Sequence, residues 1–365
     1  MSILQEGHVI RDTYQVERLL GEGAFAEVYR VKHRFLGRQA MKVFKTPGMT
    51  LKGTQEMLGE ALLLSKIGHP NIVRVFDANL FDLDNLSYGY FTMEYVPGGS
   101  LENYWLSHSD QPMPVETVVN LVSQICQGLS LAHSSDPPIV HRDIKPQNIL
   151  VGYDGDHIRL RISDFGLAKR VNPLTLLASA RGTLVYKPPE VFADYRCDSC
   201  AGDVWAIGCI FYLLLTDEFP FRNLSESEEI GLIDFQSEVT SPSKINSQVD
   251  QYLEEIIAKC LEIDPAKRYP NAMALQKDLC VWQHNIGTKS DFEHYKNNRS
   301  GLSDLIQQGT EDQANQLCSK AIELSKNPNR LEEAAQMMEQ AFRILPSLRE
   351  RYEYLVGLWR KGLSG

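Results

Sequence analysis

The stretch HRDIKPQN occupies residues 141 to 148, directly after an apolar pair, and DFG occupies residues 164 to 166. The segment NILV begins with the last residue of the first stretch, and LRIS ends just before the second. Both segments have the apolar content and length of a short pair of strands. That arrangement sets Asn148 and Asp164 at the ends of adjacent strands. The polar side chains of the two stretches are therefore predicted to meet at one edge of a strand pair.

Asn148 and Asp164 carry oxygen atoms of the kind that Mg²⁺ prefers, and two such ligands could share a metal ion that bridges phosphates. Asp143 could align an acceptor hydroxyl, and Lys145 could reach a transferring phosphate as a point charge. Phosphoryl transfer goes through a loose transition state, so a protein mostly positions the reactants and neutralises their charge. The loop is therefore predicted to transfer phosphate with Mg²⁺, or with Mn²⁺ as the alternative ion.

The composition, 43% hydrophobic and 23% charged over 365 residues, is that of a soluble globular protein. Asp and Glu number 47 against 37 Lys and Arg, which argues against nonspecific binding to nucleic acid or anionic lipid. The N-terminus does not resemble a signal peptide, and the longest apolar run, residues 204 to 215, is too short to cross a bilayer. Seven cysteines without a spacing rule suit a reducing compartment. We expect a cytoplasmic protein with no nucleic-acid or membrane partner.

The hydrophobic period changes along the chain. In the first hundred residues YQVERLL, EVYRVKH and QAMKVF have the patterns of strands, whereas from about residue 115 the period is helical, as in VETVVNLVSQICQGLSLAH. We therefore predict an α+β fold over residues 10 to 285, with a strand-rich lobe followed by a helix-rich lobe. A polar linker over residues 286 to 302 would lead to a small all-α module over residues 303 to 363.

The segment GEGAFAEV joins the first two predicted strands and places Gly21 and Gly23 where a hairpin could pass over a phosphate. Glycine lets the backbone approach an anion closely, although glycine pairs are also common in ordinary hairpins. Lys42 in QAMKVF would leave an ammonium group in an apolar lobe unless it is paired, and Glu60 on the next helical segment is its predicted partner. Alone, Lys42 would be interpreted as an exposed residue on an edge strand, and only the other motifs favour a role in the site.

In their order and spacing these motifs resemble the eukaryotic-type protein kinase family, from about residue 10 to 285, and look most like its bacterial members. The resemblance implies a bilobal kinase fold, ATP as cofactor and a protein substrate. Lys145 in HRDIKPQN and Thr183 in RGTLVYKPPE resemble residues of the serine/threonine-specific members of the family. The resemblance therefore implies Ser or Thr as the acceptor. The family resemblance also implies that Glu190 pairs with Arg268 and that Asp203 braces the catalytic loop.

The resemblance carries over residue by residue. Asp143 would be the catalytic base, assisted by Lys145, Lys42, Glu60 and Thr183. Asn148 and Asp164 would hold the metal. The implied ATP-binding residues are Gly21, Glu22, Gly23, Val28, Ala40, Lys42, Met93, Glu94, Val96 and Leu150. Two departures, Ala26 for the third loop glycine and Pro188 for the alanine of APE, remove no chemical group.

Arg142 has a predicted regulatory meaning. Its charge lies beside the catalytic base and must be neutralised, which a phosphate on the segment after DFG could do. Thr175 and Ser179 are candidate acceptors there. Ser179 lies four residues before Thr183, which resembles the usual activating site. Ser179 could equally be no more than a small loop residue, and the sequence leaves both interpretations open.

Two other functions compete with an active kinase. A nucleotide-binding pseudokinase could serve as a scaffold, and a small-molecule phosphotransferase could share the fold. Pseudokinases usually lack at least one of the residues that bind the nucleotide or the metal or act as the base. This chain has the complete set, which favours activity: Lys42, Glu60, Asp143, Asn148 and Asp164. Thr183, Glu190 and Arg268, the match to a protein-substrate segment, disfavour the small-molecule enzyme.

The tail shows three helix starts, each with Thr, Asn or Ser three residues before Gln or Glu, at Thr310, Asn329 and Ser347. The second, LEEAAQMMEQAFRILP, resembles the second helix of a tetratricopeptide repeat. One repeat cannot bury both faces, and exposed apolar stripes are rare on soluble monomers. We therefore expect either the helix-rich lobe or a protein partner to cover the apolar face of the third helix, formed by Tyr352, Leu355 and Trp359. The lobe is favoured because a flexible linker of about eighteen residues would span only roughly 20 to 25 Å.

Overall fold

The computed structural model describes residues 2–48, 50–57, 59, 65, 68–108, 113–155, 157–165, 184–194, 197–221, 235, 239–285, 316–327, 330–344 and 348–360. The chain divides into two compact units, Met1–His284 and Asn285–Gly365. Each unit is described by itself. No helix within the described ranges is long and apolar enough to cross a membrane.

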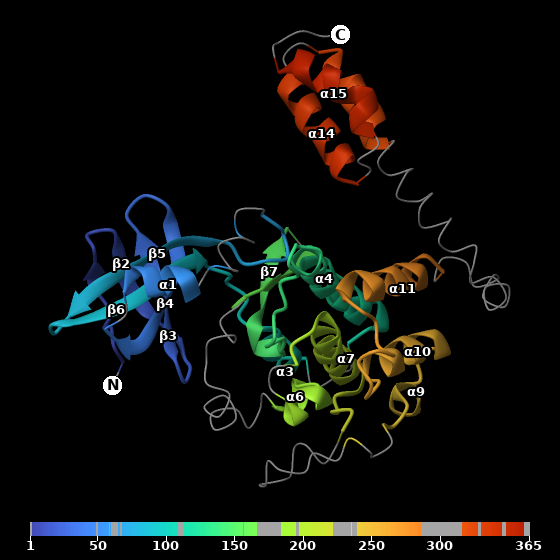
Figure 1. The fold of residues 1–365 in the computed structure, drawn as a ribbon, viewed down its shortest axis with the longest axis horizontal. Coiled ribbons are helices and arrows are strands. Elements are labelled where there is room, and N and C mark those ends of the chain that lie inside the picture. The colour runs from blue at the N-terminus through green and yellow to red at the C-terminus, as the bar shows by residue number, and fades with distance from the viewer. Residues whose placement is uncertain are drawn as a thin grey trace. The chain divides into compact units, whose positions relative to one another are not determined.

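The first unit begins with a six-stranded antiparallel sheet, the N-lobe, in the order β1-β2-β3-β4-β6-β5 (Figure 1). The strands are β1 (Val9–Ile10), β2 (Tyr14–Glu22), β3 (Ala26–His33), β4 (Gly37–Pro47), β5 (Val75–Leu83) and β6 (Leu86–Glu94), with α1 (Leu51–Met57) between β4 and β5. The three strands predicted between residues 14 and 44 are confirmed. The short strand β1 has no signal in the sequence.

The two faces of the sheet carry separate apolar clusters because side chains alternate along each strand. On β4, Met41 and Val43 belong to one cluster, while Ala40 and Phe44 belong to the other. Lys42 lies between Met41 and Val43 in the sequence, so the alternation sends it to the face of Ala40 and Phe44. That face also carries Val96 and Leu150 from outside the sheet, so it adjoins the helical lobe.

The helical C-lobe follows. Its elements are α3 (Leu101–Leu106), α4 (Val115–His133), η1 (Pro146–Asn148), β7 (Ile149–Asp154), β8 (His157–Ile162), η3 (Leu184–Tyr186), α6 (Pro189–Ala193), α7 (Cys200–Thr216), α9 (Pro242–Ile245), α10 (Gln251–Cys260) and α11 (Ala272–Asn285). The predicted helix at 115 to 133 and the strand pair around 150 and 160 are confirmed. The fold is therefore a β-rich N-lobe followed by an α-helical C-lobe.

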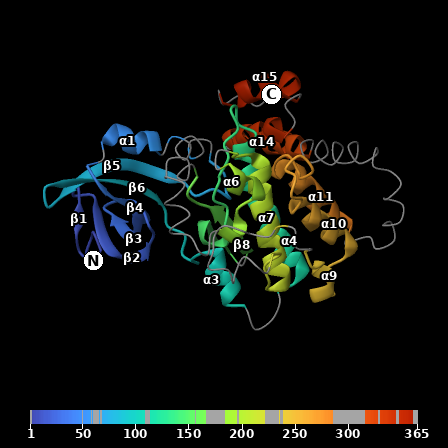
Figure 2. The same cartoon turned by 60° about the horizontal axis from the view of Figure 1, so that its bottom comes forward.

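Helix α7 is the centre of the C-lobe core, and α4 packs beside it (Figure 2). The apolar run at 204 to 215 lies inside α7, and every one of its residues is buried. Ser199 caps the helix because its side chain accepts a hydrogen bond from the N–H of Gly202 at 3.0 Å. The cap fixes the start of α7, and with it the position of Asp203 in the first turn.

The second unit contains a helix over residues 316–325, α14 (Leu331–Ile344) and α15 (Leu348–Trp359). Helices α14 and α15 begin close to the predicted starts at Asn329 and Ser347, which, like Thr310, lie outside the described residues. Small residues of α14 let the helices approach one another. The buried residues are Cys318, Ala321, Leu331, Ala334, Ala335, Met338, Ala341, Phe342, Leu348, Val356 and Trp359.

This cluster corrects the expectation for the third helix. Trp359 is 2% exposed and Val356 is 6% exposed, and both are buried inside the second unit itself. Tyr352 and Leu355 pack against the same cluster. The apolar stripe of α15 therefore needs neither the C-lobe nor a partner to cover it, because α14 and the helix at 316–325 do so.

Candidate active site

The loop HRDIKPQN is fixed through its backbone by Asp203, which is 2% exposed. The N–H groups of His141 and Arg142 donate to its two carboxylate oxygens at 2.7 and 2.9 Å. His133 Nε2 lies 3.0 Å from Oδ2, and because His133 Nδ1 accepts from the N–H of Ala272 at 3.1 Å, the ring donates through Nε2. Burial alone would raise the pKa of Asp203, but these donors lower it. The predicted brace on the loop is present.

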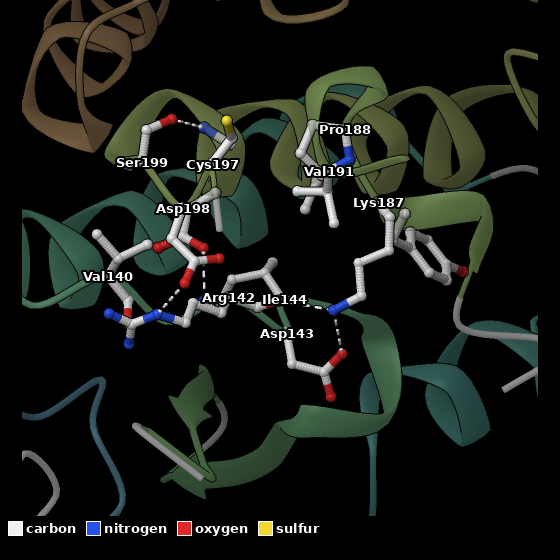
Figure 3. A pocket seen from close by; sticks show the side chains of 14 residues that line it. Val140, Arg142, Asp143, Ile144, Lys187, Pro188, Val191, Cys197, Asp198 and Ser199 are labelled. Atoms are coloured by element: carbon white, nitrogen blue, oxygen red, sulfur yellow. Dashed lines mark hydrogen bonds and ion pairs between the residues drawn. The ribbon is translucent and has the colours of Figure 1, made fainter. Parts of the chain in front are cut away.

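Asp143 lies between two lysines. Lys145 Nζ is 2.9 Å from Oδ2. Lys187 Nζ is 3.0 Å from Oδ1 (Figure 3). The side-chain amide of Asn148 donates to the backbone oxygen of Asp143 at 2.8 Å and to Oδ2 at 3.0 Å. Burial alone would raise the pKa of Asp143, but Lys187 and Lys145 outweigh it and hold the pKa well below the usual range. Asp143 is therefore a carboxylate at neutral pH.

Two non-glycine residues of the site have left-handed backbone conformations, Arg142 with φ 72° and Asp164 with φ 65°. Such conformations cost of order 1–3 kcal/mol and persist where the surroundings hold them, often at functional sites. Here the backbone of Arg142 is held by Asp203 and by Lys187 Nζ, which donates to the Arg142 carbonyl at 2.7 Å. The site therefore contains backbone strain that the fold maintains.

The strand pair β7 and β8 brings the two predicted metal ligands to one end. Ile149 pairs with Ile162, and the N–H of Ser163 donates to the carbonyl of Asn148 at 2.8 Å. Asn148 therefore precedes one strand at the end where Asp164 follows the other, as the sequence predicted. His141 Nε2 contacts the Ser163 carbonyl at 2.8 Å, which ties this end to the catalytic loop.

The oxygen atoms at this end suit a divalent ion. Within the described part of the chain, both hydrogen bonds of the buried Asn148 side-chain amide use its nitrogen, which leaves the oxygen as its remaining polar atom. Asp164 Oδ1 is buried and accepts no well-aligned hydrogen bond in the described part of the chain, although Lys42 Nζ forms an ion pair with it at 2.8 Å. Mg²⁺ in phosphate-transfer sites takes one or two such protein oxygens and completes its shell with phosphate and water. Asn148 and Asp164 therefore fit this metal.

Lys42 points from the centre of the sheet toward this end. Strand β4 lies between β3 and β6, and the Lys42 side chain is 16% exposed, so the alternative of an exposed lysine on an edge strand is wrong. Its predicted partner Glu60 lies outside the described residues. The partner that the structure gives is Asp164, which the sequence reasoning had assigned to the metal alone.

The apolar residues predicted to hold the adenine belong to one cluster. Ala40, Met93 and Val96 are buried, and Val28 and Leu150 pack against them while partly exposed. Ala40 pairs with Met93 across β4 and β6, and Val28 pairs with Lys42 across β3 and β4. The cluster therefore forms an apolar surface beside Lys42, as a flat aromatic ligand next to phosphates would require.

The segment after Met93 connects the lobes. Glu94 receives an ion pair from Arg161 Nε at 2.9 Å, and the N–H of Gly98 donates to the carbonyl of Val151 at 3.0 Å. A Cβ at Gly98 would stand 2.3 Å from that carbonyl oxygen, so this position requires glycine. The connecting segment, which contains the predicted ATP-binding residues Glu94 and Val96, is therefore tied to β7 and β8 of the C-lobe.

The presence of glycine at positions 21 and 23 has a different explanation from that at Gly98. Neither has a positive φ, and a Cβ would meet nothing within 4 Å at Gly21 and only the Ala26 carbonyl, at 3.6 Å, at Gly23. Neither backbone conformation nor internal packing therefore demands glycine there. The missing side chains leave open space above the β2–β3 hairpin, which suits the approach of an external group. The side chain of Glu22 between them is paired with Lys45.

This chain is similar to known proteins in its sequence. Residues 14–280 match the family described as the protein kinase domain. The chain belongs to the protein kinase family. The probable serine/threonine-protein kinase PknB of Lactococcus lactis is 30% identical over 287 residues, which are 76% of this chain and 43% of the relative. The serine/threonine-protein kinase PrkC of Bacillus subtilis is 32% identical over 277 residues, 75% of this chain and 41% of the relative. The chain thus spans less than half the length of these two relatives.

A solved structure agrees with the kinase fold. The crystal structure of the Mycobacterium tuberculosis PknI kinase domain matches with a TM-score of 0.55 and 23% identity, over 76% of this chain and 99% of that one. In the present kinase domain Arg268 is 3% exposed and contacts both oxygens of Glu190, at 2.8 and 2.7 Å, as predicted. This pair fixes α6 against the C-lobe.

The kinase domain leaves part of the prediction outside the described residues, namely Glu60, Thr175, Ser179 and Thr183. Besides the ion pair of Lys42 with Asp164, sequence reasoning missed the contact of Lys187 with Asp143. It also missed the contact of Arg142 Nε with Asp198 Oδ2 at 2.7 Å. The sequence carried a weak signal for Lys187, because it belongs to the quoted segment RGTLVYKPPE. Asp198 gave none.

Proposed function

We propose that this chain is an ATP-dependent serine/threonine protein kinase that transfers the γ-phosphate of ATP to Ser and Thr hydroxyls of proteins, including its own. The observation that carries the proposal is the setting of Asp143. Its carboxylate is held by Lys145, Lys187 and Asn148, and it stays ionised. A carboxylate so oriented can accept a hydrogen bond from an incoming hydroxyl and take its proton late in the transfer.

The other residues have roles in binding and charge neutralisation. The apolar cluster around Ala40 and Met93 would hold the adenine, and the hairpin at Gly21 and Gly23 would cover the phosphates. Lys42 would contact the α- and β-phosphates. Lys145 is close enough to Asp143 to reach the phosphate that is being transferred.

Asn148 and Asp164 would hold Mg²⁺, with Mn²⁺ as an alternative. The metal, when bound, neutralises the charge that develops on the phosphate oxygens. Because Lys42 and the metal would share Asp164, nucleotide binding should redirect Lys42 from Asp164 to the phosphates, which carry more negative charge. The predicted pairing of Lys42 with Glu60, which lies outside the described residues, would then hold Lys42 toward the phosphates.

The second unit offers a surface for a protein partner. The helices α14 and α15 pack against each other, and the sequence of α14 resembles the second helix of a tetratricopeptide repeat. The family match ends at residue 280, before them. Because their apolar faces already cover one another, a protein partner would bind the outer surface of residues 303 to 363.

The cysteines bear on the proposed cytoplasmic location. All seven are free, which is consistent with the reducing cytoplasm, where ATP is available.

The purified full chain should transfer labelled γ-phosphate from Mg²⁺ and ATP to degenerate peptides whose acceptor is Ser or Thr, and not to matched peptides with Tyr. EDTA should abolish the transfer. Lys42→Met is the control, since it removes a phosphate contact and should lower the rate by about a hundredfold. If ATP raises the melting temperature while transfer by the wild type equals that of Lys42→Met, the chain is a pseudokinase scaffold and the proposal fails.

Lys187→Met should shift the pH dependence of the reaction. Lys187 lowers the pKa of Asp143, so its removal raises that pKa, and the base becomes protonated at a higher pH as the solution is acidified. Because the pKa of Asp143 is held well below the usual carboxyl range, its acid limb in kcat/KM lies below about pH 4 and should move upward toward that range; the profile is followed from about pH 8 down to the lowest pH at which both proteins stay folded. At neutral pH kcat should fall about tenfold, the size of one charge-assisted hydrogen bond.

The control for Lys187→Met is Lys326→Met, which removes a lysine paired with Glu323 in the second unit. It should leave the profile unchanged. An acid limb that stays in place in a folded Lys187→Met protein would mean that Lys187 does not tune Asp143.

A further inference from the structure

Arg142 already has a counter-charge within the described chain. Its Nε donates to Asp198 Oδ2 at 2.7 Å, and its Nη1 donates to the carbonyl of Val140 at 2.8 Å (Figure 3). The Arg142 side chain is 13% exposed and that of Asp198 is 33% exposed. An ion pair this shielded is screened by salt far less than a pair on the open surface. The guanidinium is therefore held in one place by the fold.

Asp198 itself sits on a fixed segment. The N–H of Cys197 before it donates to the carbonyl of Asp194 at 2.9 Å, and Ser199 after it is the cap of α7. Asp198 therefore lies directly before the cap of α7, and Asp203 lies in the first turn of that helix. Asp203 holds the backbone of Arg142, and Asp198 holds its side chain.

The contacts that Asp203 and Asp198 make with Arg142 also affect the position of Asp143, the proposed catalytic base. Arg142 is the neighbour of Asp143, and its carbonyl accepts from Lys187 Nζ, which also contacts Asp143 Oδ1. With φ 72°, Arg142 has a strained backbone that relaxes if its contacts are lost. A guanidinium without a counter-charge would seek another carboxylate or water, and the position of the loop would become less defined.

We propose that Asp198 is a positioning residue that supplies the counter-charge of Arg142 permanently, in place of a phosphate on the segment after DFG. The inference rests on the proposed kinase activity. It follows that phosphate transfer does not require prior phosphorylation of Thr175 or Ser179. The other source of counter-charge, a phosphate at either residue, predicts the reverse.

Two sets of variants separate these sources. Asp198→Asn keeps the shape of the side chain and removes its charge, so kcat for the serine and threonine peptides should fall about tenfold, with KM for ATP changed less than about twofold. Asp198→Glu should recover most of the rate because it restores the carboxylate. Adding Arg142→Gln to Asp198→Asn should cause no further loss, since the two residues act as one pair. The double variant Thr175→Ala, Ser179→Ala should keep the wild-type rate within about twofold.

The matched control is Asp154→Asn, which breaks an Asp–Arg pair of the same geometry, Arg159 Nε to Oδ2 at 2.8 Å, at the β7–β8 turn. It should leave kcat unchanged, and its melting temperature and nucleotide-induced shift should match those of Asp198→Asn. Mass spectrometry of the wild type records whether residues 166 to 183 carry phosphate during the assay.

Three results would overturn the inference. Asp198→Asn with the wild-type rate, or a faster one, would show that Asp198 does not position the loop. A rate that falls tenfold or more in Thr175→Ala, Ser179→Ala, or after treatment of the wild type with a protein phosphatase, would make phosphate the counter-charge. Independent, additive losses in Asp198→Asn and Arg142→Gln would show that the pair does not act together. A wild type no more active than Lys42→Met would instead refute the proposed function.

Discussion

Replacing Asp164 by asparagine should reduce phosphate transfer by at least about a hundredfold, because it removes one preorganised charge from the place where negative charge develops. Asp164 is the one carboxylate of the predicted metal pair, and its Oδ1 is buried without a well-aligned hydrogen bond in the described part of the chain. An amide oxygen binds Mg²⁺ more weakly than a carboxylate does. The neutral side chain would also leave Lys42 without the ion pair at 2.8 Å.

The rate for the serine and threonine peptides should be measured over a range of Mg²⁺ and ATP concentrations. Asp154→Asn is the control, since it makes the same chemical change at the far end of the β7–β8 pair, where Asp154 is 49% exposed. Saturating Mg²⁺ should not restore Asp164→Asn to the wild-type rate. A rate within tenfold of wild type at ordinary Mg²⁺ would remove Asp164 from the metal site.

The sequence predicted this end of the site well because its geometry is local. Asn148 and Asp164 flank two strands joined by a short turn, and the antiparallel register of Ile149 with Ile162 follows from that connection. Lys42 was placed by alternation along β4, which depends only on the period of a strand. Such patterns fix which face a side chain occupies, so they carried the candidate site.

What the sequence did not predict depends on how distant segments pack. Lys187 reaches Asp143 and Asp198 reaches Arg142 only because α6 and α7 lie against the catalytic loop. No periodicity or cap relates a loop residue to a charged residue that far away in the chain. Burial also changes the meaning of a charge: Asp198 in the sequence is one of many acidic residues, whereas in the fold it neutralises a nearly buried guanidinium.

The tail shows a further limit. The caps and periodicity predicted the helices α14 and α15, yet the same apolar pattern on α15 suits a lobe, a partner or a neighbouring helix equally well. Ala334 and Ala335, which are fully buried, favour the neighbouring helix because small residues allow close packing. The sequence contained these alanines, but their contacts required the fold.

Asp143→Asn should lower phosphate transfer by about 10²–10⁴-fold, the range of a positioned general base, and should leave nucleotide binding intact. The asparagine can still accept hydrogen bonds from Lys145 and Asn148, so the shape of the loop should persist. It cannot take a proton from the acceptor hydroxyl, and it no longer offsets the charge of Lys187. The loss should therefore be in kcat, with KM for ATP nearly unchanged.

The melting temperature with and without Mg²⁺ and ATP separates binding from catalysis in this variant. The shift caused by nucleotide should equal that of the wild type, because the apolar cluster around Ala40 and Met93 lies apart from Asp143. Lys42→Met is the contrasting variant, in which both the shift and the rate should fall. If Asp143→Asn kept a rate within tenfold of wild type, or lost the nucleotide shift together with the rate, Asp143 would not be the base, and the carboxylate that two lysines hold would have a structural role.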